Sequence, residues 1–235
     1  MIKTYISTII LLCTYFLANA QTSYLKCIYA ETPAVSDQVR EMKDVYLRDI
    51  VVSKFKKEKK TYTMFVANNK YLFTKVSDKT NNPNMLIGAY NSIYIDKGTD
   101  SIISERTIVN KNYVIKDIAI APRWKMTNET RIINGKKCTK AIARGLLKIE
   151  AWYTTDIPFS YGPLGYYGLP GLIIELDTPS DIYTLKSFEY LQKDPELKSI
   201  ANGQVVTKTE FDKIQENYFT KYGEAKAGEV VIVEK

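Results

Sequence analysis

The stretch GPLGYYGLPGLIIEL, Gly162–Leu176, decides how this chain is read. Four of the chain's 11 glycines recur here at every third position, with two prolines between them. An apolar run of leucine and isoleucine follows at once, as in a strand that enters the core of a sheet. A Walker phosphate loop needs Lys-Ser/Thr after its last glycine, and a dinucleotide fingerprint needs the spacing G-x-G. Both are absent, and four repeats are too few for a collagen helix.

The same stretch predicts a packed connection between two strands. The Ile157-Pro158 step ends the preceding strand, because proline cannot donate to a sheet ladder. Glycines permit tight turns and close backbone approach, and the loop's tyrosines and leucines give it an apolar surface that can pack. The alternative is a loop shaped to contact a ligand or partner. The candidate functional loop and its neighbours are Trp124, Trp152, Asp156, Tyr161, Tyr166, Tyr167, Gly168, Pro170 and Gly171.

The rest of the chain favours antiparallel strands. Apolar residues alternate in 62–66 and at Val114, Ile118 and Ile120, which is typical of a sheet with one buried face. Residues 137–153 predict a hairpin whose turn uses a positive φ at Gly145. Further tight turns are expected at Asn68–Lys70 and Asn134–Gly135. The chain holds roughly nine to eleven short strands by this pattern.

One helix is expected near the C-terminus. Thr207 and Glu210 fit a capping box, and Phe211, Ile214, Tyr218 and Tyr222 then share one helical face up to Gly223. A shorter helix is expected over Pro195–Ala201. The predicted fold class is mainly β or α+β: a single curved antiparallel sheet or half-barrel, with a C-terminal helix packed on it.

The first residues predict export. Lys3, the apolar run Ile6–Leu17 and the small-x-small step Ala18–Ala20 indicate a secretory signal peptide over residues 1–20. The run is short for a membrane anchor, and the leucine before its cysteine argues against a lipoprotein. We expect residues 21–235 to form a single domain in the periplasm or outside the cell, without a transmembrane segment.

Charge and residue usage exclude several classes of function. The net charge is +7, and the basic residues are scattered apart from KFKKEKK at Lys54–Lys60. We expect that run to be a solvated strand end or hairpin tip, with a patch for an anionic surface as the alternative. Nucleic-acid binding is not expected. The chain has no histidine, which excludes Ser-His-Asp and Cys-His catalysis and histidine zinc sites.

The two cysteines of the expected mature chain are Cys27 and Cys138. An even count in an exported protein permits a disulfide between them, while a free state stays equally open because sequence does not supply the required Cα distance. Calcium binding is not expected either, since no D-x-D-x-D pattern occurs.

An ordered set of motifs resembles one protein family. Trp124 is followed by INGKKCTKA at Ile133–Ala141, AWYT at Ala151–Thr154, DIP at Asp156–Pro158, GP at Gly162–Pro163 and GLPGLI at Gly168–Ile173. This set is similar to the GLPGLI family of exported proteins from Bacteroidota. The resemblance implies an envelope or secreted protein, and it implies no activity, catalytic residue or metal ligand.

Three functions stay open. The favoured one is a non-enzymatic binding or carrier protein for a hydrophobic ligand, a peptide or an envelope partner, by analogy with the LolA-like lipoprotein carriers. A second is a structural or assembly partner of an outer-membrane system. A third is a carboxylate-dependent hydrolase using Glu150, Asp156 or Glu175, which is disfavoured because carboxylates beside turns are usually solvated. No catalytic residue, metal or cofactor is assigned.

Overall fold

The computed structural model describes residues 24–34, 43–57, 60–76, 89–108, 111–145, 148–200 and 202–222. The expected signal peptide lies outside these ranges. The elements in chain order are β1 (Tyr24–Pro33), α3 (Val45–Lys57), β2 (Lys60–Ala67), β3 (Lys70–Lys75), β4 (Ala89–Asp96), β5 (Ser101–Ile108), β6 (Lys111–Ile118), β7 (Trp124–Ile133), β8 (Lys136–Ala143), β9 (Ile149–Thr154), the 3₁₀ turn η1 (Pro163–Gly165), β10 (Leu172–Asp177), β11 (Asp181–Leu191), β12 (Gln204–Thr207) and α4 (Lys208–Tyr222).

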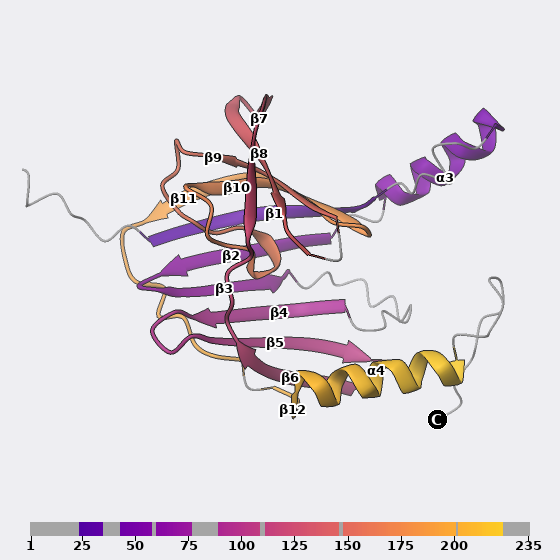
Figure 1. Ribbon diagram of the computed structural model, residues 1–235, viewed down its shortest axis with the longest axis vertical. Coiled ribbons are helices and arrows are strands. Elements are labelled where there is room, and N and C mark those ends of the chain that lie inside the picture. The colour runs from indigo at the N-terminus through magenta and orange to yellow at the C-terminus, as the bar shows by residue number, and fades with distance from the viewer. Residues whose placement is uncertain are drawn as a thin grey trace, which may run out of the picture.

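The described strands form one open sheet. Their order is β12-β6-β5-β4-β3-β2-β1-β11-β10-β9-β8-β7, so β12 and β7 are its two edges. Neighbours are antiparallel except β12 and β6, which are parallel. In Figure 1, β1 to β6 run side by side, whereas β7 and β8 stand almost perpendicular in front of them. The predicted fold class is confirmed, with 12 strands where at most eleven were expected.

Alternation and turn chemistry explain most of the strands. Tyr62, Met64 and Val66 are buried on one face of β2, as their parity predicts. Asn68 and Asn69 both have positive φ in the turn between β2 and β3, and Asn134 and Gly135 do the same between β7 and β8. Both tight turns are therefore confirmed, and their twist suits a two-residue hairpin.

Two details of the strand predictions are wrong. The hairpin of β8 and β9 forms, but Gly145 is not among the residues with positive φ, because the connection is longer than a tight turn. On β6 the buried residues are Tyr113, Val114 and Ile115, while Ile118 is 67% exposed where the strand ends. Ile120 lies beyond β6 and is 79% exposed. The alternation predicted over this stretch is interrupted at that point.

The C-terminal helix begins at its predicted cap. The Thr207 hydroxyl accepts a hydrogen bond from the Glu210 amide (3.2 Å), and the Glu210 carboxylate accepts one from the Thr207 amide (2.7 Å). Phe211, Ile214 and Tyr218 then pack on β6, as Figure 1 shows for the helix as a whole. The expected stop at Gly223 lies outside the described residues.

Other helix expectations are wrong. The basic run at Lys54–Lys60 was expected at a strand end or hairpin tip, but residues 54–57 end helix α3, and of the described residues in the run Lys60 alone stands at a strand end, as the first residue of β2. Asp44 caps that helix by accepting a hydrogen bond from the Leu47 amide at 3.0 Å. The helix was not predicted, because its apolar residues show only a weak helical periodicity. The short helix expected over Pro195–Ala201 does not form, since residues 195–200 have no regular structure.

Both cysteines are free and buried. Cys27 lies on β1 and Cys138 on β8, with β11, β10 and β9 between those strands in the sheet. The disulfide that the sequence permits is therefore absent from the structure. Burial raises the pKa of both thiols, which makes them poor nucleophiles. No helix among the described residues is long and apolar enough to cross a membrane.

Candidate functional site

The glycine-rich stretch forms the connection between β9 and β10, residues 155–171, which we call the signature loop. Ile157, Tyr161 and Leu169 of the loop are buried in the main core. The loop therefore packs on the sheet, which confirms the prediction of a packed connection. Phe159, Leu164, Tyr166 and Tyr167 of the loop pack against the same core.

Buried tyrosines of the sheet hold the loop backbone. The Tyr71 hydroxyl donates to the Gly162 carbonyl (2.8 Å) and accepts from the Gly165 amide (2.9 Å). The Tyr29 hydroxyl donates to the carbonyl of Ile173, just after the loop, at 2.6 Å. Burial raises the pKa of both tyrosines well above the usual value, so both hydroxyls stay neutral. These bonds satisfy loop groups that would otherwise be buried without a partner.

Two loop glycines are required for different physical reasons. A Cβ on Gly171 would lie 1.9 Å from the Thr154 carbonyl oxygen, so no side chain fits between the two strands there. Gly168 has a φ of +94°, which L-residues rarely adopt, although its nearest neighbour would be 3.7 Å from a Cβ. The other two glycines repeat this pattern, because a Cβ on Gly162 would lie 2.6 Å from the Ile173 side chain and Gly165 has a φ of +75°.

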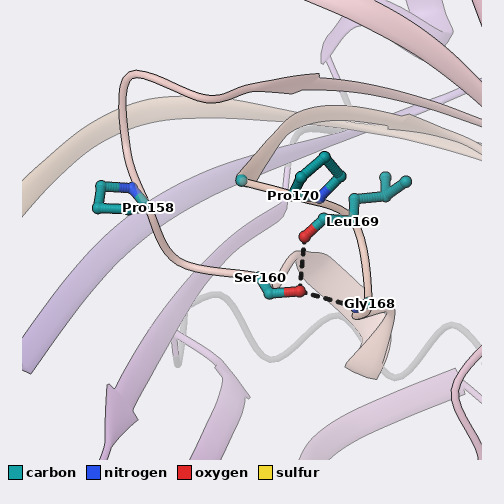
Figure 2. A pocket seen from close by; sticks show the side chains of 6 residues that line it. Pro158, Ser160, Gly168, Leu169 and Pro170 are labelled. Carbon is teal, nitrogen blue, oxygen red and sulfur yellow. Dashed lines mark hydrogen bonds between the residues drawn. The ribbon is translucent and has the colours of Figure 1, made fainter.

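The exposed rim of the loop surrounds a surface depression. Its volume is about 470 Å³, and the residues that line it are Pro158, Ser160, Gly168, Leu169, Pro170 and Gly171. Figure 2 shows the Ser160 hydroxyl between two backbone groups of the rim. This hydroxyl donates to the Leu169 carbonyl at 2.6 Å and accepts from the Gly168 amide at 3.1 Å. The rim is thus held in one conformation, and none of its six residues is an acid or a base.

Trp124 and three loop tyrosines meet beside this rim. The Trp124 indole N–H donates to the Tyr167 carbonyl at 2.9 Å, and the Tyr166 ring lies 6.0 Å from the indole. The ammonium of Lys97 lies 4.2 Å from the ring centroid of Tyr161 and 4.6 Å from that of Tyr167. Burial raises the pKa of Tyr161 to about 12, so its ring stays a neutral partner for that cation. Lys97 was not expected at this place from the sequence.

Trp152 and Asp156 lie apart from that cluster. Trp152 is on the opposite face of β9 from the buried Tyr153, and the Arg131 guanidinium stacks 4.0 Å from its ring. Asp156 is exposed in the turn after β9. The structure therefore gathers Trp124, the loop tyrosines, Gly168, Pro170 and Gly171, but it does not bring Trp152 into the same group.

Two of the three carboxylates considered for catalysis are held in separate ion pairs, while Asp156 is exposed in the turn after β9. Glu175 pairs with Arg131, whereas Glu150 accepts from Lys140 (3.0 Å) and Lys148 (3.2 Å). Although burial opposes ionisation, these two ammonium groups hold the pKa of Glu150 below its usual value. A general acid would need a raised pKa, so this arrangement does not support the hydrolase hypothesis.

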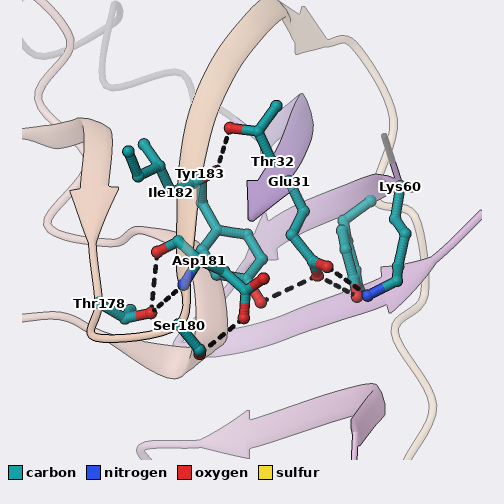
Figure 3. A network of polar contacts seen from close by, with 9 residues as sticks. Glu31, Thr32, Lys60, Thr178, Ser180, Asp181, Ile182 and Tyr183 are labelled. Carbon is teal, nitrogen blue, oxygen red and sulfur yellow. Dashed lines mark hydrogen bonds and ion pairs between the residues drawn. The ribbon is translucent and has the colours of Figure 1, made fainter. Parts of the chain in front are cut away.

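A buried carboxylate network on β1 was missed from the sequence. Glu31 is 2% exposed, pairs with Lys60, and accepts from the hydroxyls of Tyr62 (2.7 Å) and Tyr183 (3.0 Å), as Figure 3 shows. Burial and then the charge of Glu31 raise the pKa of nearby Asp181. The parity of β1, which places Glu31 on the same face as Tyr29, was the signal that could have found it.

The described residues contain no candidate metal centre. No group of three or more Cys, Asp or Glu side chains in those ranges could hold a metal ion, and the chain has no histidine. The Glu31 network uses its oxygens for a lysine and two tyrosines, so it is a closed set of hydrogen bonds. Its geometry fits a structural role between β1, β2 and β11.

Comparisons with known proteins agree with this fold. The family model Porph_ging, described as a protein of unknown function, matches residues 144–175, which include the whole signature loop. The resemblance to the GLPGLI family is thereby confirmed. No curated protein matches the chain.

Two solved structures of PNGF-II are similar. The one in space group P21 has a TM-score of 0.51 and 16% identity, and the alignment covers 83% of this chain and 33% of the PNGF-II chain. The one in space group C2 has a TM-score of 0.48 with the same identity and coverage. This chain spans about a third of PNGF-II, and the likeness shows the fold alone.

Proposed function

We propose that the protein is an exported, non-enzymatic binding protein that recognises a hydrophobic ligand, peptide or envelope partner at the rim of the signature loop. The observation that carries the proposal is the depression beside Ser160, whose rim is fixed from behind by buried hydrogen bonds. A fixed hollow that combines apolar side chains, here of Pro158, Leu169 and Pro170, with a few polar groups is a usual form of a small binding site.

Rigidity of the rim supports binding. The loop is anchored on its inner side by Tyr71 and across its base by Ser160, so ordering it on binding costs little entropy. Pro158 and Pro170 are exposed on the rim and already restricted in φ. A partner that docks here meets a surface with its conformation already set.

The absence of ionisable groups from the rim argues against catalysis there. The six lining residues include no acid, base or thiol. Glu175 and Glu150 are paired with arginine and lysine, and Asp156 is a single exposed carboxylate in the turn after β9. An interior carrier site is also less favoured, because loop side chains fill the core under the sheet. The proposal therefore places the ligand on the outer surface of the loop.

Blocking the rim tests this proposal. Native mass spectrometry and a pull-down are made on protein purified from its own envelope fraction, for the wild type, Pro170→Arg and the control Pro179→Arg. Pro179 is an exposed proline in the turn after β10. We expect a reproducible bound mass or one stoichiometric partner, lost in Pro170→Arg and kept in Pro179→Arg, with unchanged melting temperatures. An empty wild type, or equal binding by both variants, overturns the proposal.

A single stoichiometric protein in that pull-down would indicate an assembly partner in the envelope. A bound small molecule released by organic extraction would indicate a ligand-binding protein instead. Both results keep the rim as the binding surface and separate the two non-enzymatic functions.

A further inference from the structure

We infer that the free edge of β7 binds an extended acidic segment of another protein, which adds to the sheet as a further strand. This inference goes beyond the proposed function, because it concerns the opposite end of β7 from the signature loop and needs no occupant on the loop rim. It rests on three observations: an unpaired edge, an exposed apolar side chain on that edge, and a concentration of positive charge.

The backbone groups of β7 that are free to pair with a further strand follow from the hairpin register. β7 is the last strand in the order, and within the described part of the chain it pairs with β8 alone. The two-residue turn makes Ile133 and Lys136 the closing pair, which is hydrogen-bonded in such hairpins. Hydrogen-bonded and non-bonded pairs alternate, so the N–H and C=O groups of Ile132 and Thr130 point away from β8. An added strand would find its first ladder positions there.

The Ile132 side chain on this edge is also exposed to solvent. Ile132 is 68% exposed, and Met126 further along β7 is 46% exposed. Peptides that add to a sheet edge gain affinity from the backbone ladder and specificity from alternate side chains. An apolar residue on the incoming strand would cover Ile132.

The charge of the chain is concentrated on this hairpin. Residues 122–145 contain seven basic residues and one acidic residue, a net charge of +6, whereas the whole chain has +7. This cluster adds to the basic run at Lys54–Lys60 that already stands out in the sequence. Arg131 is paired with Glu175 of β10, and Lys140 is paired with Glu150 of the neighbouring strand β9. The others are Arg123, Lys125, Lys136, Lys137 and Arg144, and within the described residues they form no ion pair.

Charge complementarity indicates which kind of strand binds the β7 edge. Lys125 and Lys137 are exposed on β7 and β8, and Lys137 lies directly opposite Ile132 in the hairpin register. An acidic strand would be attracted to this edge, and a basic strand or a second copy of this hairpin would be repelled. The other edge, β12, has four residues and none is charged, so it lacks this selectivity.

The test uses a synthetic peptide of alternating glutamate and valine, with a lysine–valine peptide as its matched control. Binding to the full folded chain is followed by NMR, with hydrogen exchange of the Thr130 and Ile132 amides as the specific readout. We expect the acidic peptide to bind, to protect these two amides, and to bind less tightly as salt rises. Absence of binding, protection at β12 instead, or equal binding of the lysine peptide overturns the inference.

Two pairs of variants separate the contribution of backbone pairing from that of charge. Ile132→Pro removes the outward N–H and is expected to weaken binding about tenfold, whereas Ile132→Thr keeps that N–H and loses less. The double variant Lys125→Glu with Lys137→Glu should abolish the preference for the acidic peptide. Its control, Lys111→Glu with Lys198→Glu, makes the same change in net charge at exposed lysines elsewhere. An equal loss in the control pair would show general attraction and overturn the inference.

Discussion

The signature loop and the β7–β8 hairpin touch each other at Trp124 and are stabilised in different ways. The loop has buried tyrosines behind its backbone and a glycine with no room for a side chain. The hairpin is an exposed ribbon at the edge of the sheet, with charged side chains and a tight Asn-Gly turn. The GLPGLI segment therefore lies where the chain packs tightly, whereas the INGKKCTKA segment of the same motif set lies in the exposed, charged hairpin.

The largest expected effect is the loss of stability when Gly171 of the signature loop is replaced. Gly171→Ala places a methyl group 1.9 Å from the Thr154 carbonyl oxygen, so the strands must move apart. We expect it to lower the free energy of unfolding by about 3–5 kcal/mol, measured by urea denaturation.

Gly135→Ala in the hairpin turn is the matched control. Gly135 has a φ of +75° but no atom within 4 Å of a Cβ, so only backbone strain opposes the change. A loss of about 1 kcal/mol is expected. Equal losses at the two glycines would contradict the distinction between a packed loop and an open turn.

The next effect concerns the tyrosine that holds the loop. Tyr71→Phe removes the hydroxyl that satisfies both the Gly162 carbonyl and the Gly165 amide. We expect a loss of about 2–3 kcal/mol in unfolding free energy, because two buried backbone groups lose their partner. Tyr190→Phe, at a tyrosine that is 46% exposed, serves as control and should change little. Similar losses in both variants would show that the loop does not depend on this anchor.

A smaller effect is expected where the two regions meet. Trp124→Phe keeps an aromatic ring against Tyr166 but loses the N–H that donates to the Tyr167 carbonyl. We expect a loss of about 1 kcal/mol. Hydrogen exchange should show faster opening at both the loop and the start of β7. Faster exchange in only one of them would mean that the indole does not couple the two regions.

The sequence predicts the local patterns better than the curling of the sheet. Period-two alternation identified β2, asparagine and glycine identified two turns, and Thr207 with Glu210 identified the start of α4. These signals depend on residues near each other in the chain, so they are visible without the fold. The β12–β6 pairing and the contact between Tyr71 and the loop join distant segments and leave no such trace.

The candidate loop shows the same limit. The glycine spacing predicted a packed connection, which is what forms, but the residues bound to its backbone lie on β1 and β3. Trp152 was grouped with the loop because it is close in sequence, yet strand alternation points it at Arg131 on the other face. Lys97 and Glu31 were missed because their partners lie far away in the sequence, in the signature loop and on β11 respectively.

The smallest expected effect is a pH dependence of stability where β9 pairs with β8 of the hairpin, at Glu150. In the folded protein, burial disfavours the charge on Glu150, but Lys140 and Lys148 outweigh it and lower the pKa below the ordinary value of 4.5. The unfolded chain then binds this proton more tightly than the folded one. The stabilisation is therefore complete above about pH 4.5 and is lost as pH falls through the folded-state pKa.

Hydrogen-exchange protection factors measured near neutral pH and at about pH 3 would test this dependence. Amides of β8 and β9 should lose protection in acid, whereas the Ile173 amide, bonded to the Tyr161 carbonyl at 3.0 Å, should keep it. Glu150→Gln should remove the difference at the hairpin, because its amide does not titrate. If the loop loosened first in acid, the buried tyrosine contacts would not be what holds it, and the contrast between the two regions would fail.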